Sequence, residues 1–256
     1  MKTTFIYRLD ASTICWLLFV LMMLMVFIGL KLRSKYKLSN GLGPLEGSMF
    51  GLLALILAFT FGMSGSRFDA RRTIVVQEAN DIGTAILRAD LYPDSTKLAF
   101  KKDFSGYLES RIAFYEAKLD EKTIRQAALQ EKKFGKLLWE RAAANSRNPA
   151  LFVASNSMIP ALNAIFDTST SRDAALNAKV PDPIIWLLII LSICCSFFAG
   201  LEVPLDKKVN WLTIFGFGLF SIMVIYVILD LDRPRSGLIT TDRNQQYIYA
   251  LRDLLK

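Results

Sequence analysis

The sequence predicts an all-α membrane protein in which four transmembrane helices, two before and two after, flank a cytosolic helical bundle. Three observations predict this fold. The 256 residues contain four uncharged apolar blocks, two near each end. The segment between the two pairs is rich in charge, and its apolar residues recur at helical spacing. No stretch alternates cleanly between apolar and polar residues, so no sheet is expected.

Each apolar block is long enough to cross the membrane. About 20 apolar residues in a helix span the roughly 30 Å hydrocarbon core, and a soluble domain would not gather its apolar residues in this way. The first block is too long for a signal peptide and lacks a small-residue cleavage site, so it is predicted to be an uncleaved anchor. The predicted spans cover residues 11–30, 47–65, 184–201 and 209–229.

The segment 66–180 is predicted to form amphipathic helices outside the membrane. Pro93 should end the first of them, the third is expected from about 121 to 144, and the fourth over 150–167 with a break or bend at Pro160. The first apolar stripe of this segment begins soon after the second span. We therefore expect the second span and the first of these helices to be one continuous helix.

The composition excludes several classes of function. There are 31 Lys and Arg against 23 Asp and Glu, and a net charge of +8 in a membrane protein is typical of surfaces near anionic headgroups. No nucleic-acid-binding pattern is present. The absence of histidine excludes His-based triads and His metal ligands, and no nucleotide-binding or nucleophile motif occurs. The three cysteines lie inside predicted spans as packing residues. We expect neither an enzyme nor a cofactor.

The second span carries a stripe of residues that are four apart. Gly47, Gly51, Leu55 and Phe59 fall on one face of a helix. A GxxxG pair is common where membrane helices pack closely, and periodicity alone favours that interpretation. The functional alternative is a pore-lining stripe in an oligomer, with Gly51 followed by a hydrophobic constriction at Leu55 and Phe59.

Polar residues continue along the same helix. Arg67 and Arg71 are typical of snorkelling anchors at the membrane interface, and the functional alternative is a ring of positive charge at a pore exit. Glu78, Asn80 and Asp81 follow one to two turns later. Exposed surface is the ordinary interpretation of such residues, and polar contact between helices or subunits is the alternative.

Two carboxylates, Asp230 and Asp232, follow the last span. Carboxylate oxygens suit a hard cation such as Ca²⁺, but two are too few for a full site, and Arg233 and Arg235 oppose a cation. We therefore favour a capped helix end with salt bridges over a metal site. No charge lies at the centre of a span, which argues against coupled transport.

The positive-inside rule gives the orientation. More Lys and Arg flank the spans on the side of the N-terminus, the middle segment and the C-terminus, so these parts are predicted to be cytoplasmic. The compact basic cluster over residues 31–37 argues the other way.

Four stretches of the chain resemble the bestrophin-like domain family of bacterial membrane proteins, which is distantly similar to the bestrophin ion channels. They are residues 53–59, 67–72, 76–80 and 232–237. The resemblance implies two spans, a cytosolic helical block and two more spans. It also implies a homopentamer whose second span lines the pore, with Gly51, Leu55 and Phe59 at neck positions, and so makes the pore-lining interpretation of the stripe the better one.

Some residues depart from the bestrophin pattern. Phe68 and Asp69 stand where bestrophins have tryptophans, and Gly51 replaces a bulky neck residue, so that a constriction would be wider there. Of the acidic cluster that binds calcium in bestrophins, only Asp230 and Asp232 remain, which argues against calcium gating.

We therefore expect a multi-pass protein of the bacterial inner membrane that forms a homo-oligomeric ion channel. Its partners would be the lipid bilayer, further copies of the chain and small permeant ions, with anions slightly favoured by the positive charge. The alternative is a non-conducting membrane scaffold or sensor that binds a cytoplasmic partner through its helical segment. The expected parts are residues 1–65, 66–180, 181–230 and the short tail 231–256.

Overall fold

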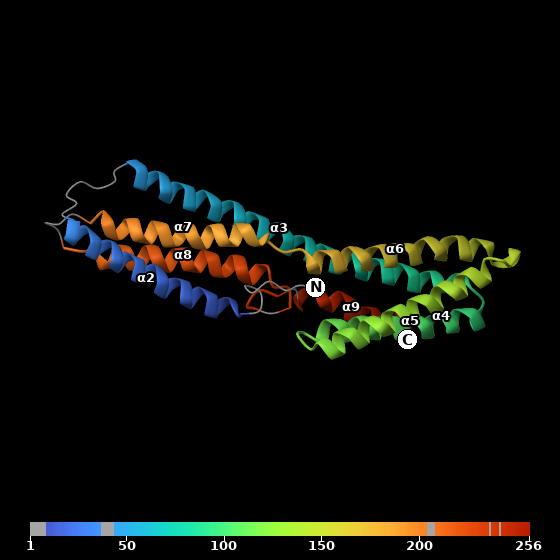
Figure 1. The fold of residues 1–256 in the computed structure, drawn as a ribbon. Coiled ribbons are helices and arrows are strands. Elements are labelled where there is room, and N and C mark those ends of the chain that lie inside the picture. The colour runs from blue at the N-terminus through green and yellow to red at the C-terminus, as the bar shows by residue number, and fades with distance from the viewer. Residues whose placement is uncertain (1–8, 37–43, 204–207, 236, 241) are drawn as a thin grey trace. The chain divides into compact units, whose positions relative to one another are not determined.

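The computed structural model describes residues 9–36, 44–203, 208–235, 237–240 and 242–256, and these form helices and short connections without a strand. Figure 1 shows the helices along the chain. They divide into two compact units. The first unit comprises residues 1–66 and 179–233, and the second comprises residues 67–178 and 234–256. The predicted all-α fold is confirmed.

Four helices are long and apolar enough to cross a membrane, as predicted. Three of them belong to the first unit, which also holds the first part of the long helix α3. The four helices are α2 (Ala11–Tyr36), α3 (Pro44–Arg88), α7 (Asp182–Leu201) and α8 (Trp211–Leu231). Helix α3 runs for 45 residues without interruption, which agrees with the expected continuous helix.

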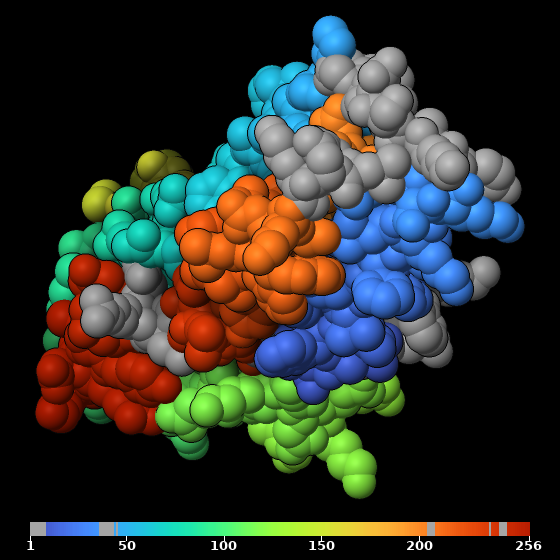
Figure 2. All heavy atoms as spheres, turned by 90° about the vertical axis from the view of Figure 1, so that its left-hand side faces the viewer, coloured from blue at the N-terminus to red at the C-terminus, as the bar shows by residue number. Residues whose placement is uncertain are grey.

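Within the first unit, α2 packs lengthwise against α7 and α8 (Figure 1). In Figure 2 the blue side chains of α2 lie directly against the orange side chains of α8. Two glycines allow the backbones of α2 and α7 to touch. A Cβ atom on Gly29 would collide with the carbonyl oxygen of Phe197, and one on Gly200 with that of Val26. Small residues permit such close approach between membrane helices.

The core of this unit is largely apolar, and two of its buried hydroxyl groups are satisfied within their own helix. Met22, Leu188 and Ile228 are almost fully buried. The hydroxyls of Ser192 and Ser196 donate to backbone carbonyls one turn earlier, at 2.7 and 2.8 Å, so these buried groups do not depend on another helix. The cysteines Cys15, Cys194 and Cys195 are free and contribute packing, as expected.

The second unit contains the rest of α3 and the remaining helices. They are α4 (Asp94–Glu116), α5 (Glu121–Asn145), α6 (Phe152–Asn177) and α9 (Asp242–Ala250), with 3₁₀ turns at Ala89–Leu91, Pro149–Leu151 and Leu251–Leu255. The prediction that the first helix ends at Pro93 is close to the structure, in which α3 ends at Arg88, the 3₁₀ turn after it ends at Leu91, and Pro93 directly precedes α4. The Asp120 carboxylate accepts from the backbone N–H of Lys122 and caps α5.

The fourth helix of this segment differs from its prediction. Helix α6 continues through Pro160 and ends at Asn177, ten residues beyond the expected end at 167. Its final part is rich in Ser, Thr and Asp, which favour turns over helix. Thr168 and Arg172 nevertheless bond to residues of other helices, so tertiary contacts override the local preference. Beside Pro160, the Ser157 carbonyl accepts a hydrogen bond from Arg88 at 2.5 Å.

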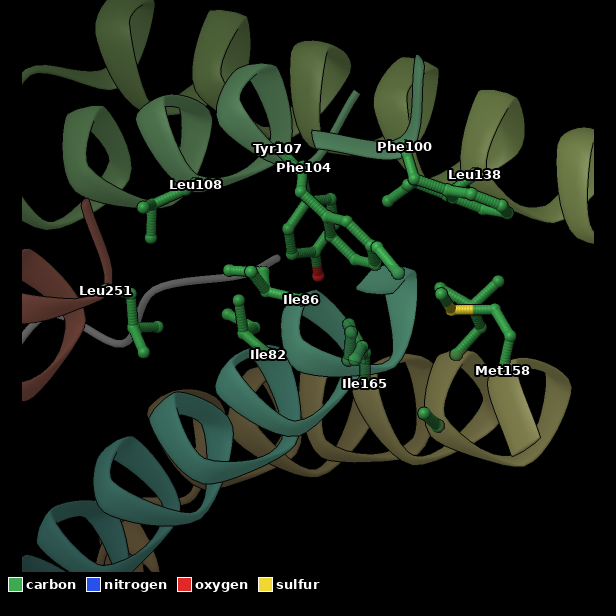
Figure 3. Close-up of a cluster of buried hydrophobic side chains, with 14 of the residues drawn as sticks. Ile82, Ile86, Phe100, Phe104, Tyr107, Leu108, Leu138, Met158, Ile165 and Leu251 are labelled. Carbon is green, nitrogen blue, oxygen red and sulfur yellow. The ribbon is translucent and has the colours of Figure 1, made fainter. Parts of the chain in front are cut away.

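The apolar core of the second unit joins α3, α4, α5 and α6. In Figure 3 the side chains of Ile82 and Ile86 point toward Phe104 and Leu108. The C-terminal tail completes this core, because Ile248 and Leu251 are also buried in it. Burying each side chain of this size contributes about 1.5–3 kcal/mol. Residues that the prediction treated as a short tail are therefore part of the folded unit.

Candidate functional site

The predicted pore stripe lies on a face of α3 that the described residues of the first unit leave largely uncovered. Leu55 is 52% exposed, Phe59 is 66% exposed, and Gly51 is also exposed. Residues on the other side of the same helix are buried, among them Leu53 and Thr60 at 1% exposure. In a membrane, this apolar face of α3 must contact lipid, another copy of the chain or a pore.

The GxxxG pair does not hold helices of one chain together. Nothing in the described part of the chain lies within 4 Å of a Cβ atom built on Gly47 or Gly51. Close packing within the chain instead uses Gly29 and Gly200, which lie on α2 and α7 and form no sequence motif with each other. The open space beside Gly47 and Gly51 belongs to the same uncovered face as the stripe.

The candidate pore-exit arginines lie further along α3. Arg67 is half-buried and Arg71 is 3% exposed, and their spacing of four residues places them on one face of the helix. Asp69 and Arg72 lie on other faces, where they are exposed and form a loose ion pair at 3.7 Å.

Glu78 is at the centre of a buried ionic cluster in the second unit. Its carboxylate accepts from Nε of Arg111 at 2.6 Å, from Nη1 of Arg172 at 2.5 Å and from the hydroxyl of Tyr115 at 2.8 Å. The donors come from α4 and α6, so Glu78 joins three helices. Both Glu78 and Arg111 are 0% exposed.

A second carboxylate, on α5, completes the cluster. Glu131 accepts from Nη1 of Arg111 at 3.1 Å, from Nη2 of Arg172 at 3.3 Å and from the hydroxyl of Ser169 at 2.6 Å. Two arginines and two glutamates thus balance each other in the ionic cluster, which we define as Glu78, Arg111, Glu131 and Arg172. Buried charges of this kind are tolerated when they are paired and hydrogen-bonded.

Electrostatics keep all four members charged. Burial alone would raise the pKa of Glu78, but the guanidinium groups of Arg111 and Arg172 outweigh it and hold that pKa below its ordinary value. Burial likewise opposes the charge of Glu131, but Arg111 and Arg172 outweigh it and lower the pKa of this carboxyl. Burial opposes the charge of Arg111, yet the two carboxylates raise its pKa. The cluster is thus a fixed ionic connection between α3, α4, α5 and α6.

The other two polar candidates of α3 differ from each other. Asp81 accepts from Gln77 at 2.8 Å on its own helix and from the hydroxyl of Thr168 on α6 at 2.5 Å. Asn80 is exposed. Glu78 and Asp81 therefore contact other helices, whereas Asn80 faces away from them.

The two carboxylates after the last span are buried, each with 1% exposure. Oδ2 of Asp232 accepts from the backbone N–H of Val180 at 2.8 Å, a contact that joins the beginning and the end of the segment 179–233 of the first unit. No three His, Cys, Asp or Glu side chains gather into a possible metal site among the described residues.

Sequence reasoning missed Arg111, Glu131 and Arg172. A signal for Arg111 was present, because it lies between Leu108 and Ile112, two apolar residues whose spacing of four places them on one face of a helix. A charge on the buried face of a helix requires a buried partner. The partner itself was not predictable, since Glu78 lies 33 residues away from Arg111 and 94 from Arg172.

Comparison with known proteins identifies the family. The model of the bestrophin-like domain matches residues 16–245, which is most of the chain. The chain belongs to the bestrophin-like family. The predicted resemblance is therefore confirmed, and the four apolar helices are those of a membrane protein of this family. No curated protein matches the sequence.

Solved structures of bacterial bestrophin homologues from Klebsiella pneumoniae share the fold. A variant with a tryptophan-to-alanine substitution has a TM-score of 0.73 and 11% identity, over 96% of this chain and 96% of that one. A variant with a tyrosine-to-alanine substitution has a TM-score of 0.71 and 12% identity, over 93% and 98%. A structure phased with zinc has a TM-score of 0.71 and 12% identity, over 93% of this chain and 97% of that one. At these identities the likeness shows the fold alone.

Proposed function

We propose that the chain assembles into a homopentameric ion channel in which α3 lines the pore, with Gly51, Leu55 and Phe59 at its neck. The observation that carries the proposal is the uncovered face of α3. Leu55 and Phe59 are more than half exposed and Gly51 has open space beside it within the described part of the chain, although Leu53 and Thr60 on the other side of the same helix are buried. Membership of the bestrophin-like family, together with the resemblance to bestrophin channels, supports the same role.

The chemistry of the stripe suits a hydrophobic neck. Five copies of Leu55 and Phe59 around an axis would form two successive apolar rings, and such constrictions gate by dewetting. Gly51 adds no side chain, so the passage would widen one turn away. Arg67 and Arg71 would add positive charge further along the helix and favour anions.

The assembly can be tested by electron cryo-microscopy of the purified chain in nanodiscs. We expect a ring of five copies with α3 around a central axis. A monomer, or a two-fold dimer without an axial opening, would remove the pore and favour the scaffold or sensor instead. The cytoplasmic location of the N-terminus, the second unit and the C-terminus is part of the proposal, and labelling of cysteines introduced at exposed positions from either side of the membrane tests it.

The role of the stripe is tested by currents in planar bilayers. Phe59→Ala should raise the single-channel conductance or abolish closure, because it removes the largest apolar ring from the neck. Phe61→Ala is the matched control, since Phe61 is 46% exposed but lies about 200° around the same helix. We expect it to conduct like the unchanged protein. Equal currents for both variants would exclude Phe59 from the constriction.

A further inference from the structure

The second unit contains a cavity of about 680 Å³ that the proposed pore does not use. It is bounded by the end of α4, the last turns of α6 and the segment that follows the last span. Two cations and several apolar side chains line it, and none of the Asp or Glu side chains that the structure describes does. The principal lining residues are Phe114, Lys118, Leu119, Leu176, Arg235 and Leu238.

Arg235 forms hydrogen bonds through only one of its three side-chain nitrogen atoms to the described residues. Its Nη1 atom donates to the backbone carbonyls of Phe114 and Lys118, both at 3.2 Å, and so caps the end of α4. The guanidinium lies 4.2 Å from the ring centre of Phe114. Nε and Nη2 also carry N–H groups. No acceptor for them, and no carboxylate in salt-bridge contact with Arg235, occurs among the described residues.

The surroundings of Arg235 make its charge costly. Arg111 and Arg172 also face the Phe114 ring, at 4.7 and 5.0 Å from its centre, but the two glutamates of the ionic cluster neutralise them. Asp173, whose negative charge favours the charged form of Arg235, is itself paired with Arg172 at 3.1 Å. Burial first, and then the like charges of Arg111 and Arg172, lower the pKa of Arg235 below its ordinary value. Lys118 is exposed and adds positive charge to the cavity, and its ammonium group has no ion-pair partner among the described residues.

We propose that this cavity binds an organic anion, whose carboxylate or phosphate contacts Arg235 and Lys118 and whose apolar body packs against Phe114, Leu119 and Leu176. An acidic head group would fill the free N–H positions of a planar guanidinium, which suits carboxylates and phosphates. Pockets of this size that combine apolar walls with a few convergent polar groups are typical of small-molecule sites. The ligand is either a free amphiphilic acid or the head of an anionic lipid.

The test is calorimetric titration of the full chain in phosphatidylcholine nanodiscs with 2-naphthoate, with empty nanodiscs as the blank. We expect saturable binding at neutral pH. The neutral isostere 2-naphthamide should bind the unchanged protein about tenfold more weakly, because it lacks the charge that pairs with Arg235. This comparison needs no variant, so it does not depend on how a substitution affects folding. Equal affinities for 2-naphthoate and 2-naphthamide would overturn the proposal.

Substitutions locate the site. Arg235→Gln should weaken 2-naphthoate binding about tenfold or more, and Arg235→Lys, which keeps the charge, should weaken it less. Arg147→Gln is the matched control, since Arg147 is exposed and lies outside the cavity. It should bind like the unchanged protein. Binding that is the same in Arg235→Gln and Arg147→Gln would overturn the proposal.

The source of the anion is distinguished by adding phosphatidylglycerol to the nanodiscs. If the head of an anionic lipid occupies the cavity, the apparent affinity for 2-naphthoate falls in the unchanged protein but not in Arg235→Gln. If affinity is unaffected, the site takes a free acid. Both results support an anion site at Arg235, which stands whether or not the chain conducts ions.

Discussion

The two units of the molecule bury different chemistry. The first unit is held mainly by apolar side chains and by the direct approach of two helix backbones at Gly29 and Gly200, and its buried carboxylates, Asp230 and Asp232, lie at the end of α8. The second has an apolar core of similar kind, but beside it lies the ionic cluster of Glu78, Arg111, Glu131 and Arg172. Large apolar side chains such as Trp16 and Phe220 remain exposed on the first unit, at 70% and 69%.

The proposed surroundings of the two units, lipid for the first and water for the second, account for this difference. Lipid tails are as apolar as leucine, so membrane helices gain little from hiding apolar surface and depend on close van der Waals packing. A unit in water gains from burying apolar surface and tolerates internal charge only when every charge has a partner. The first unit should therefore be sensitive to added volume, and the second to removal of a charge.

The largest loss of stability, in the second unit, is expected from Glu78→Gln. This change leaves two buried guanidinium groups with one carboxylate, and removing one partner of a buried pair destabilises a protein by about 3–5 kcal/mol. Hydrogen exchange of the full chain in nanodiscs should show faster exchange of the amides in α4 and α6. Amides of α2 and α7 should be unaffected.

Glu109→Gln is the control for Glu78→Gln. Glu109 also accepts hydrogen bonds from an arginine, Arg252, at 2.7 Å, but both side chains are about half exposed. Surface pairs contribute about 0–1 kcal/mol, so exchange in α4 should change little. If the two variants behave alike, the ionic cluster does not hold the second unit together.

Local signals explain which parts of the fold were predictable. Pro93 forces the preceding residue, Tyr92, out of the helical conformation, and four long apolar blocks identify spans without reference to the rest of the chain. The end of α6 was not predictable in this way. Its last turns are stabilised by the bonds of Thr168 and Arg172 to other helices. Such contacts between distant parts of the chain cannot be inferred from a local sequence pattern.

The candidate site likewise contains some residues that local spacing identifies and others whose role depends on distant contacts. The stripe of Gly51, Leu55 and Phe59 was visible because helical spacing alone places it on one face. The polar residues of α3 were visible as candidates, but which of them turn inward depends on the neighbouring helices. The capping role of Arg235 depends on Phe114, which lies 121 residues away, and the sequence gives no signal for such a contact.

A smaller loss of stability, in the first unit, is expected from Gly200→Ala. The added Cβ would collide with the carbonyl oxygen of Val26, so α2 and α7 would have to separate, and overpacking of this kind costs about 1–3 kcal/mol. Three of the four tryptophans, at 16, 186 and 211, belong to the first unit. In a Trp139→Phe background, thermal unfolding followed by tryptophan fluorescence therefore reports on this unit, and its midpoint should fall.

Gly216→Ala is the matched control on α8, because nothing in the described chain lies within 4 Å of a Cβ atom there. It should leave the midpoint unchanged or raise it, since alanine is the better helix former. A lowered midpoint in both glycine variants would point to a general loss from substitution rather than to the contact of α2 with α7.

The smallest effect is the response of the second unit to acid. The pKa values of Glu78 and Glu131 are lowered in the folded protein, so their stabilising contribution is complete above the ordinary glutamate pKa of about 4.3. It is lost as the pH falls through the lowered values. From pH 5 to pH 4 each carboxyl should remove about 0.5 kcal/mol. Hydrogen exchange of α4 should accelerate accordingly, and Glu78→Gln should show a shallower pH dependence because one titrating group is gone. An unchanged slope in that variant would mean that Glu78 is not ionised in the cluster, and the contrast between the two units would then rest on packing alone.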